Sequence, residues 1–275
     1  MCSARKEPFS YIDFSTVRQY RFGNPPNPGF DPAWTNANWL KSRFHFSFAE
    51  YHNVQNTSFG VVRVMNDDLV QPKRGFGTHP HGDMEIVTYI VNGKLSHEDS
   101  TGTRQSLGRG SIQFMSAGTG IRHSEFNHTD KPLRFIQTWI LPERRGLTPN
   151  YGGFDAGSST DKNIVRHLAS SAKDSTKKTP VKLNQDVNCH AAELEMGKTI
   201  SMDIPTGRQA YLLCVEGKLK INGEQLEKYD GCEIVGSSEP ITIEATEVEE
   251  TENGEVAHFL MFEMKEVPGS GRKDI

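Results

Sequence analysis

EIVTYIVNGKL, residues 85 to 95, joins the two features that decide the fold of this 275-residue chain: an apolar run and a tight turn. The run from Glu85 to Val91 is rich in the β-branched and aromatic side chains that favour strands. Asn92-Gly93 follows at once, and this dipeptide is a strong signal for a two-residue hairpin turn. The stretch therefore predicts a strand, a hairpin turn and an outgoing strand.

The same kind of pattern extends to both sides of this stretch. In SRFHFSFAEY, the side chains of Phe44, Phe46 and Phe48 alternate with polar residues, which is the period of a half-buried strand. Further short β-rich runs are FGVVRVMN, SIQFMSAG, PLRFIQTWILP, ITIEAT and AHFLMFEM. No long segment has helical periodicity. Short strands separated by turn residues predict an all-β sandwich or barrel.

A polar stretch divides the chain into two similar parts. The composition shifts around residues 145–180 to Gly, Ser, Thr, Pro and Lys, as expected of a connector and surface loops. Beyond it, AYLLCVEGKLKINGEQL has the same order of apolar strand, Gly-Lys-Leu turn and outgoing strand as YIVNGKLSHEDS. This weak internal repeat predicts two tandem β domains, 1–152 and 153–275.

The bulk composition excludes several classes of protein. A formal net charge of -4 without a long basic cluster gives no reason to expect direct nucleic-acid binding. No run approaches the ~18 apolar residues of a membrane span, and the first residues do not resemble a secretion signal. The four cysteines, Cys2 among them, lack CxxC spacing and are expected to be free thiols. We therefore predict a cytoplasmic protein.

Two pairs of residues, one of two histidines and one of a histidine and a glutamate, are the candidate functional residues. In THPHGDMEIVTY, His79 and His81 point to one face of a strand, and Glu85 shares that face if the strand stays regular. GIRHSEFN places His123 and Glu125 in a second pair with the same spacing. Three imidazoles and a carboxylate suit a borderline transition metal with open positions, and no cysteine is nearby to favour structural zinc.

One such pair alone would more often be an ordinary polar feature of a β protein than a metal site. The second pair favours the metal, as does the run of small residues from Ala117 to Gly120, which permits a tight turn before the second strand.

These segments resemble the two cupin motifs. His79, His81, Glu85 and Gly93 match the first motif, although one extra residue precedes the glycine; Gly110, His123 and Asn127 match the second. HPHGDMEIVTYIVNGKLSHEDS and MSAGTGIRHSEFN are together similar to pirin and to the pirin-like bacterial quercetin 2,3-dioxygenases. The resemblance is dense over residues 39–152 and much weaker afterwards.

The resemblance implies a bicupin of two jelly-roll domains. It implies that one divalent transition metal ion is bound in the first domain by His79, His81, His123 and Glu125. Fe(II) is favoured, and Ni, Cu, Mn, Co and Zn remain alternatives. Glu85 would lie behind the ligands and fix the tautomer of a ligand imidazole by a hydrogen bond, or else pair with a cation such as Arg122.

The resemblance also implies two classes of function. The first is a flavonol dioxygenase acting on an aromatic substrate such as quercetin with O2, in which Glu125 also serves as the general base. The second is a nuclear, iron-dependent transcription cofactor that binds a protein partner. Other cupin enzymes rank last, and a monomer is expected in each case.

Several further residues have weaker expectations. Met84, Phe114 and Met115 could line the cavity or belong to the plain core. His97 and His128 could line the mouth of the cavity, but a position at the surface is favoured for each. His190 and His258 are isolated in the second half, which predicts a metal-free second domain.

Overall fold

The computed structural model describes residues 9–12, 18–22, 39–49, 51–157 and 161–267. Every regular element in these ranges is a β-strand, and no helix occurs among them. The predicted all-β fold class is therefore confirmed. The described residues accordingly contain no helix able to cross a membrane. The cytoplasmic location stays a prediction.

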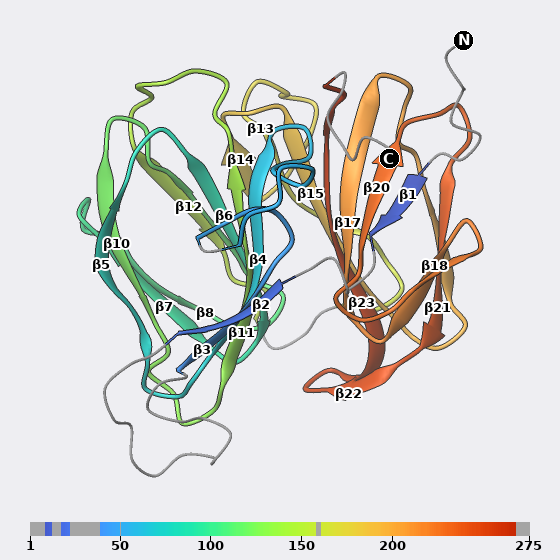
Figure 1. Cartoon of the computed structure of the whole chain (residues 1–275), viewed down its shortest axis with the longest axis horizontal. Coiled ribbons are helices and arrows are strands. Elements are labelled where there is room, and N and C mark those ends of the chain that lie inside the picture. The colour runs from blue at the N-terminus through green and yellow to red at the C-terminus, as the bar shows by residue number, and fades with distance from the viewer. Residues whose placement is uncertain (1–8, 13–17, 23–38, 50, 158–160, 268–275) are drawn as a thin grey trace.

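The first half of the chain forms two sheets, seen in the left part of Figure 1. The larger sheet has the order β12-β9-β6-β11-β4-β3-β2. Its strands are β2 (Arg18–Phe22), β3 (Leu40–Phe44), β4 (Val62–Val70), β6 (Glu85–Asn92), β9 (Ile112–Ser116), β11 (Leu133–Ile140) and β12 (Asn150–Phe154). The smaller sheet has the order β5-β10-β7-β8. Its strands are β5 (Gly75–His81), β7 (Leu95–Asp99), β8 (Arg104–Leu107) and β10 (Ile121–Phe126).

The second half repeats this arrangement. Its larger sheet has the order β1-β20-β17-β23-β15-β13-β14, with β22 paired to β23, and its smaller sheet has the order β16-β21-β18-β19. The strands of the larger sheet are β1 (Phe9–Ile12), β13 (Arg166–Ser171), β14 (Val181–Leu183), β15 (Val187–Leu194), β17 (Arg208–Glu216), β20 (Gly231–Val235), β22 (Glu249–Thr251) and β23 (Gly254–Lys265). Those of the smaller sheet are β16 (Thr199–Met202), β18 (Lys218–Ile221), β19 (Glu224–Leu226) and β21 (Ile241–Glu247). The predicted pair of similar β units is thus observed.

The Asn92-Gly93 turn does not form the expected hairpin. β6 pairs with β9 and β11 in the larger sheet, whereas β7 pairs with β8 and β10 in the smaller one. The turn therefore carries the chain from one sheet to the other. Gly93 has φ of +81°, and a Cβ there would lie 2.6 Å from the carbonyl oxygen of Pro132. A glycine is required because both the backbone conformation and the space exclude a side chain.

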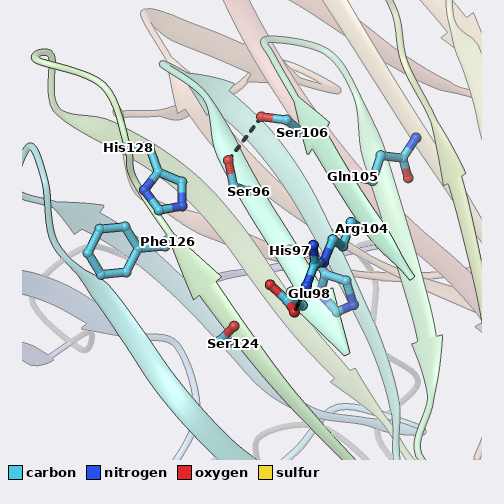
Figure 2. A pocket seen from close by; sticks show the side chains of 9 residues that line it. All are labelled: Ser96, His97, Glu98, Arg104, Gln105, Ser106, Ser124, Phe126 and His128. Carbon is cyan, nitrogen blue, oxygen red and sulfur yellow. Dashed lines mark hydrogen bonds and ion pairs between the residues drawn. The ribbon is translucent and has the colours of Figure 1, made fainter. Parts of the chain in front are cut away.

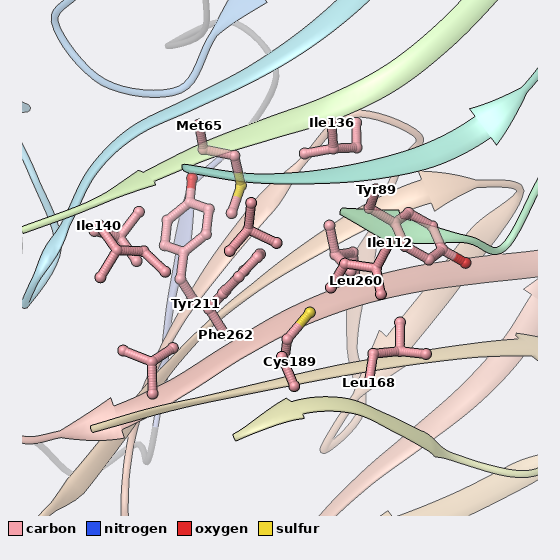
Figure 3. Packing of buried hydrophobic residues seen from close by; sticks show 14 of the residues in the cluster. Met65, Tyr89, Ile112, Ile136, Ile140, Leu168, Cys189, Tyr211, Leu260 and Phe262 are labelled. Atoms are coloured by element: carbon pink, nitrogen blue, oxygen red, sulfur yellow. The ribbon is translucent and has the colours of Figure 1, made fainter. Parts of the chain in front are cut away.

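The largest hydrophobic cluster lies between the two halves of the molecule and draws on both larger sheets (Figure 3). The first half contributes Met65, Tyr89, Ile112, Ile136 and Ile140 among others, and the second contributes Leu168, Cys189, Tyr211, Leu260 and Phe262 among others. A separate cluster fills the interior of the second half, and two smaller ones fill the first. The halves are therefore joined by a dry, core-like interface.

Buried charges also connect the halves. Arg109 donates to Glu193 at 3.0 Å and to Glu216 at 2.5 Å, and all three side chains are almost fully buried. His258, also buried, contacts Glu216 at 2.9 Å and the hydroxyl of Tyr89 at 2.9 Å. Each buried charge thus has an opposite charge in contact, as is required for ions inside a protein.

The positions of β12 and β1 are relevant to the predicted domain limits, 1–152 and 153–275. β12 runs to Phe154 and pairs with β9, in the first half. β1, at the start of the chain, pairs with β20 in the second half, beside which Figure 1 shows it. The division at residue 152 stays a prediction. Cys189, Cys214 and Cys232 are free and buried, and Cys2 lies outside the described residues.

Candidate metal centre and its cavity

Three of the predicted ligand histidines come together across two paired strands. β5 and β10 are antiparallel, with His123 opposite His79 and Ile121 opposite His81. The Nε2 atoms of His79 and His123 lie 3.0 Å apart, and the three ring centroids are 4.5 to 4.9 Å from one another. One nitrogen from each ring lies within 4.8 Å of the others, which allows a single ion to contact all three.

The predicted ligand Glu125 belongs to a second, overlapping group. A register shift between His123 and Glu125 interrupts the pairing of β10 with β5. Ligand atoms of Glu125, His123 and His97 lie within 4.8 Å of one another. The four predicted ligands therefore fall into two groups that share His123, and their joint coordination of one ion stays a prediction.

Amide side chains from the larger sheet fix the carboxylate of Glu125. Gln113 on β9 donates to Oε1 at 2.9 Å, and Gln137 on β11 donates to Oε2 at 2.7 Å. Thr88 on β6 lies 3.4 Å from Oε1. The two amides together with this hydroxyl hold the buried carboxylate in one orientation, facing the histidines.

The position favoured from the sequence for His97, a residue near the candidate metal centre, is wrong. His97 was expected at the surface, but it is only 2% exposed, contacts Asp99 at 3.1 Å and stacks on Tyr151. A signal was present in the sequence. Leu95, His97 and Asp99 share one face of β7, and the apolar Leu95 marks that face as the inner one.

Burial keeps two of the candidate ligand histidines uncharged. Burial, together with the neighbouring His123 and His79, lowers the pKa of His81 to about 4. Burial, with His79 and His97 beside it, also lowers the pKa of His123 to about 3. At neutral pH both rings thus keep a free nitrogen lone pair. The buried Nε2 of His81 has no hydrogen-bond partner within the described residues, so the site fits a transition metal.

Glu85 does not serve the metal site in the way that was predicted. Its carboxylate accepts hydrogen bonds from the backbone and side chain of Asn184 and from the backbone of Gln185, at 2.7 to 2.8 Å. None of its hydrogen bonds or ion pairs within the described part of the chain goes to an imidazole or to Arg122. The strand does not stay regular: β5 ends at His81, and Glu85 begins β6 in the other sheet. Glu85 instead links the two halves of the molecule.

A cavity of about 370 Å³ opens beside the histidines and Glu125. Its remaining walls are aromatic or aliphatic side chains and a few polar ones: Trp39, Leu40, Ser42, Phe44, Phe48, Ala49, Asn66, Asp68, Phe76, Gln137 and Trp139. Phe114 packs in the cluster between the halves, and Met84 and Met115 pack in a small cluster of the first half. Of the two predicted alternatives, Phe114 and Met115 thus follow the core one, and the partly buried Met84 packs against that core.

The outer face of the smaller sheet has a shallower groove, drawn in Figure 2. Ser96, Ser124, Phe126 and His128 contribute to it, and the ring of His128 lies 4.6 Å from that of Phe126. His128 is exposed there, as predicted. In the second half, His258 belongs to the buried ionic network and His190 stacks on His167 at 4.3 Å. Both groups able to hold a metal among the described residues lie in the first half.

Comparison with known proteins identifies the family. The pirin family model matches residues 29–140, and the model of the quercetinase C-terminal cupin domain matches residues 168–264. A pirin-like protein of Caulobacter vibrioides is 38% identical over 211 residues, which are 76% of this chain and 89% of that protein. A quercetin 2,3-dioxygenase of Escherichia coli K12 is 38% identical over 200 residues, 72% and 84% of the two chains.

Solved structures agree with this assignment. YhhW from Escherichia coli has a TM-score of 0.72 and 31% identity, covering 91% of this chain and 98% of its own. The same bacterial pirin in complex with nickel(II) has a TM-score of 0.71 and 31% identity, with 91% and 100% covered. By sequence and by architecture, this chain is a bicupin that belongs to the pirin family.

Proposed function

We propose that this protein is a metal-dependent dioxygenase of the pirin-like quercetinase type. It would open the heterocyclic ring of a flavonol such as quercetin with O2 and release carbon monoxide. The observation that carries the proposal is the cavity in which His79, His81 and Glu125 face aromatic walls. A relative 38% identical to this chain is named quercetin 2,3-dioxygenase.

The proposed cofactor is one divalent transition metal ion, with Fe(II) first and Ni, Cu, Mn, Co or Zn as alternatives. His79, His81 and His123 would hold it together with Glu125, and the nickel(II) complex of a bacterial pirin supports an ion of this class. When bound, the metal would lower the pKa of a coordinated hydroxyl and bring substrate and oxygen together.

The chain itself would orient the substrate and move one proton. The rings of Phe44, Phe48 and Trp139 would pack against a flat aromatic molecule and keep water out of the cavity. Trp139 already lies edge-on to His81, with ring centroids 4.9 Å apart. Glu125 would accept the proton of the 3-hydroxyl group as general base, while Gln113 and Gln137 keep its carboxylate in place.

Metal analysis and turnover of a ligand variant test the proposal. Protein isolated without added metal should contain about one transition metal ion per chain and consume quercetin and oxygen. His123→Ala should lose the metal and slow turnover by at least about 100-fold, since His123 belongs to both groups of ligand atoms. His190→Ala is the matched control, because it removes a largely buried histidine from the second half.

Unchanged turnover in His123→Ala would refute the metal mechanism. Stoichiometric metal without turnover of any flavonol would instead favour a regulatory protein that uses the same centre to bind a partner.

A further inference from the structure

The cavity also carries polar side chains that the proposed metal chemistry does not use. Ser42 lies on β3, and Asn66 and Asp68 lie on the neighbouring β4, with Ser42 directly opposite Asp68. All three line the cavity, and they are only 1%, 5% and 4% exposed. Asn66 and Asp68 are two residues apart on one strand, so they share the inner face. Asp67, between them, faces the opposite side and pairs with Arg134.

The hydrogen-bonding capacity of these groups is only partly used. The Oδ1 atom of Asn66 is buried and has no partner within the described residues. Ser42 donates to Oδ1 of Asp68, and no hydrogen bond within the described residues reaches Oδ2 of that carboxyl. A buried acceptor without a donor destabilises the protein, unless a bound molecule supplies the donor.

The charge of the surroundings limits what that molecule is. Burial, together with the nearby carboxylates of Asp67 and Glu125, raises the pKa of Asp68 to about 7. An anionic group, such as a carboxylate or phosphate, would meet repulsion there. A neutral hydroxyl group can donate to Asn66 and exchange a hydrogen bond with Asp68. The aromatic side chains that line the same cavity select a flat ring to carry the hydroxyl.

We propose that Ser42, Asn66 and Asp68 form a hydroxyl-binding subsite, which recognises a hydroxyl group on the outer ring of an aromatic substrate, the ring that carries no metal-bound oxygen. Naming that substrate a flavonol rests on the proposed function. The protein would then discriminate between flavonols by the hydroxyl groups on the outer ring. A site built to hydrogen-bond a hydroxyl rejects an analogue without it, because buried polar groups are left unpaired.

Binding of a matched pair of ligands tests the subsite. The pair is 3-hydroxyflavone and its 3′,4′-dihydroxy derivative, which differ only in the outer ring. Quenching of tryptophan fluorescence reports binding, because Trp39 and Trp139 line the cavity. The titrations are made without oxygen on the protein as isolated, so that nothing is turned over. The dihydroxy compound should bind about 30-fold more tightly to the wild-type protein.

Variants locate the origin of this preference. Asn66→Leu and Asp68→Leu should reduce the ratio of the two affinities to about 3-fold or less, with little loss of affinity for 3-hydroxyflavone. The matched control is Thr138→Val on β11. Thr138 also has a buried hydroxyl without a partner in the described part of the chain, but it does not line the cavity. Its substitution should leave the ratio unchanged.

The outcomes separate the subsite from the proposed function. A wild-type ratio near 1, or a full ratio retained in Asn66→Leu and Asp68→Leu, overturns the subsite even if quercetin is consumed. A ratio that depends on these residues supports the subsite even if no flavonol is turned over. Should a leucine variant fail to fold, Asp68→Asn and Ser42→Ala make the smaller change, and a ratio unaffected in both again overturns the subsite.

Discussion

Asp67 and Asp68 are adjacent residues of β4 whose carboxyl groups lie in opposite environments. Burial alone would raise the pKa of Asp67, but the charge and hydrogen bonds of Arg134 outweigh it and lower the pKa. Asp68 has only a hydroxyl donor, so burial dominates and raises its pKa to about 7. The alternation of a strand thus separates an ion-paired carboxylate at the interface from a carboxyl that readily holds a proton in the cavity.

The raised pKa of Asp68 predicts a specific effect of pH on stability. The folded protein binds this proton more tightly than the unfolded chain, whose value is 3.8, so the free energy of unfolding falls as the pH rises from about 4 through 7. Asp68→Asn removes the titration. In metal-free protein, the free energy of unfolding of Asp68→Asn minus that of the wild type should increase by roughly 2–4 kcal/mol from pH 4 to pH 8.

Urea unfolding at several pH values measures this difference. Asp161→Asn, at an exposed position, serves as control and should show a difference from wild type that hardly varies with pH. A constant difference for Asp68→Asn as well would contradict the assignment.

Single residues also show how far the candidate site could be predicted from sequence. His79, His81 and His123 were found because alternation holds along β5 and β10 and the two strands pair directly. Glu85 was misplaced because the chain changes sheets before it, and no alternation pattern crosses such a break. The subsite residue Asn66 gave no signal, because only the fold brings its strand to the cavity.

Among the connecting elements, the turn from β9 to β10 matters most for the candidate metal centre. It carries the chain from the larger sheet to the smaller one and delivers His123 to its place opposite His79. Within it, Gly118 has φ of +42°, and a Cβ there would lie 1.9 Å from the carbonyl oxygen of Leu147. Neither the conformation nor the space permits a side chain, so the turn depends on this glycine.

Gly118→Ala should therefore destabilise the protein by about 3 kcal/mol and weaken metal binding, because the backbone must move away from Leu147. Gly157→Ala is the matched control. Its φ of +70° is also unfavourable for alanine, but no atom lies within 4 Å of the added Cβ, so it should cost only about 1 kcal/mol. Equal losses in urea unfolding would show that the contact with Leu147 is not what requires the glycine.

The positions of many strands could be predicted from the sequence, but the strands with which they pair could be predicted less well. Alternating or β-branched runs marked about half of the strands of the larger sheets. Asn92-Gly93 was read as a hairpin because its local conformation fits one, although the flanking strands pair in different sheets. Turn chemistry specifies a local change of direction, while packing of the two sheets decides where the outgoing strand goes.

Across the whole molecule, the shared hydrophobic cluster makes the two halves dependent on each other. Separating them would expose side chains such as Phe59, Tyr89 and Phe262, each at most 1% exposed in the folded chain. We therefore expect both halves to unfold in one transition. All three tryptophans lie in the first half, so their fluorescence follows that half, while far-ultraviolet circular dichroism follows both. If the fluorescence changes at a clearly lower urea concentration than the circular dichroism, the halves unfold independently.

The buried ionic network across the interface is expected to be costly to break. Arg109→Leu leaves Glu193 and Glu216 without their shared cation and should lower the free energy of unfolding by about 3–5 kcal/mol. Arg104→Leu breaks an ion pair with Glu98 in which both side chains are more than half exposed, and should cost less than about 1 kcal/mol. Urea unfolding of the two variants side by side checks the contrast; similar small losses would mean that the network is dispensable.

The tandem architecture could be predicted because its sequence repeat is local. The interface between the two halves could not be predicted. The Gly-Lys-Leu repeat recurs at equivalent places, between β6 and β7 and between β17 and β18. The sequence did not indicate which surface would cover the outer faces of the two larger sheets, although it marked several of their strands as buried on both faces. Their strands read as near-continuous apolar runs, which is how a sheet buried on both faces appears.

The pairing of β1 with β20 has a consequence for how the protein is made. β1 leaves the ribosome about 220 residues before the strand that it pairs with, which at about 5–20 residues per second is on the order of 10–40 seconds. Throughout that interval the earliest strand has no edge to join. β1 is therefore among the last elements to dock, and a bulky fusion partner placed directly before it would hinder the closing step of assembly rather than its beginning.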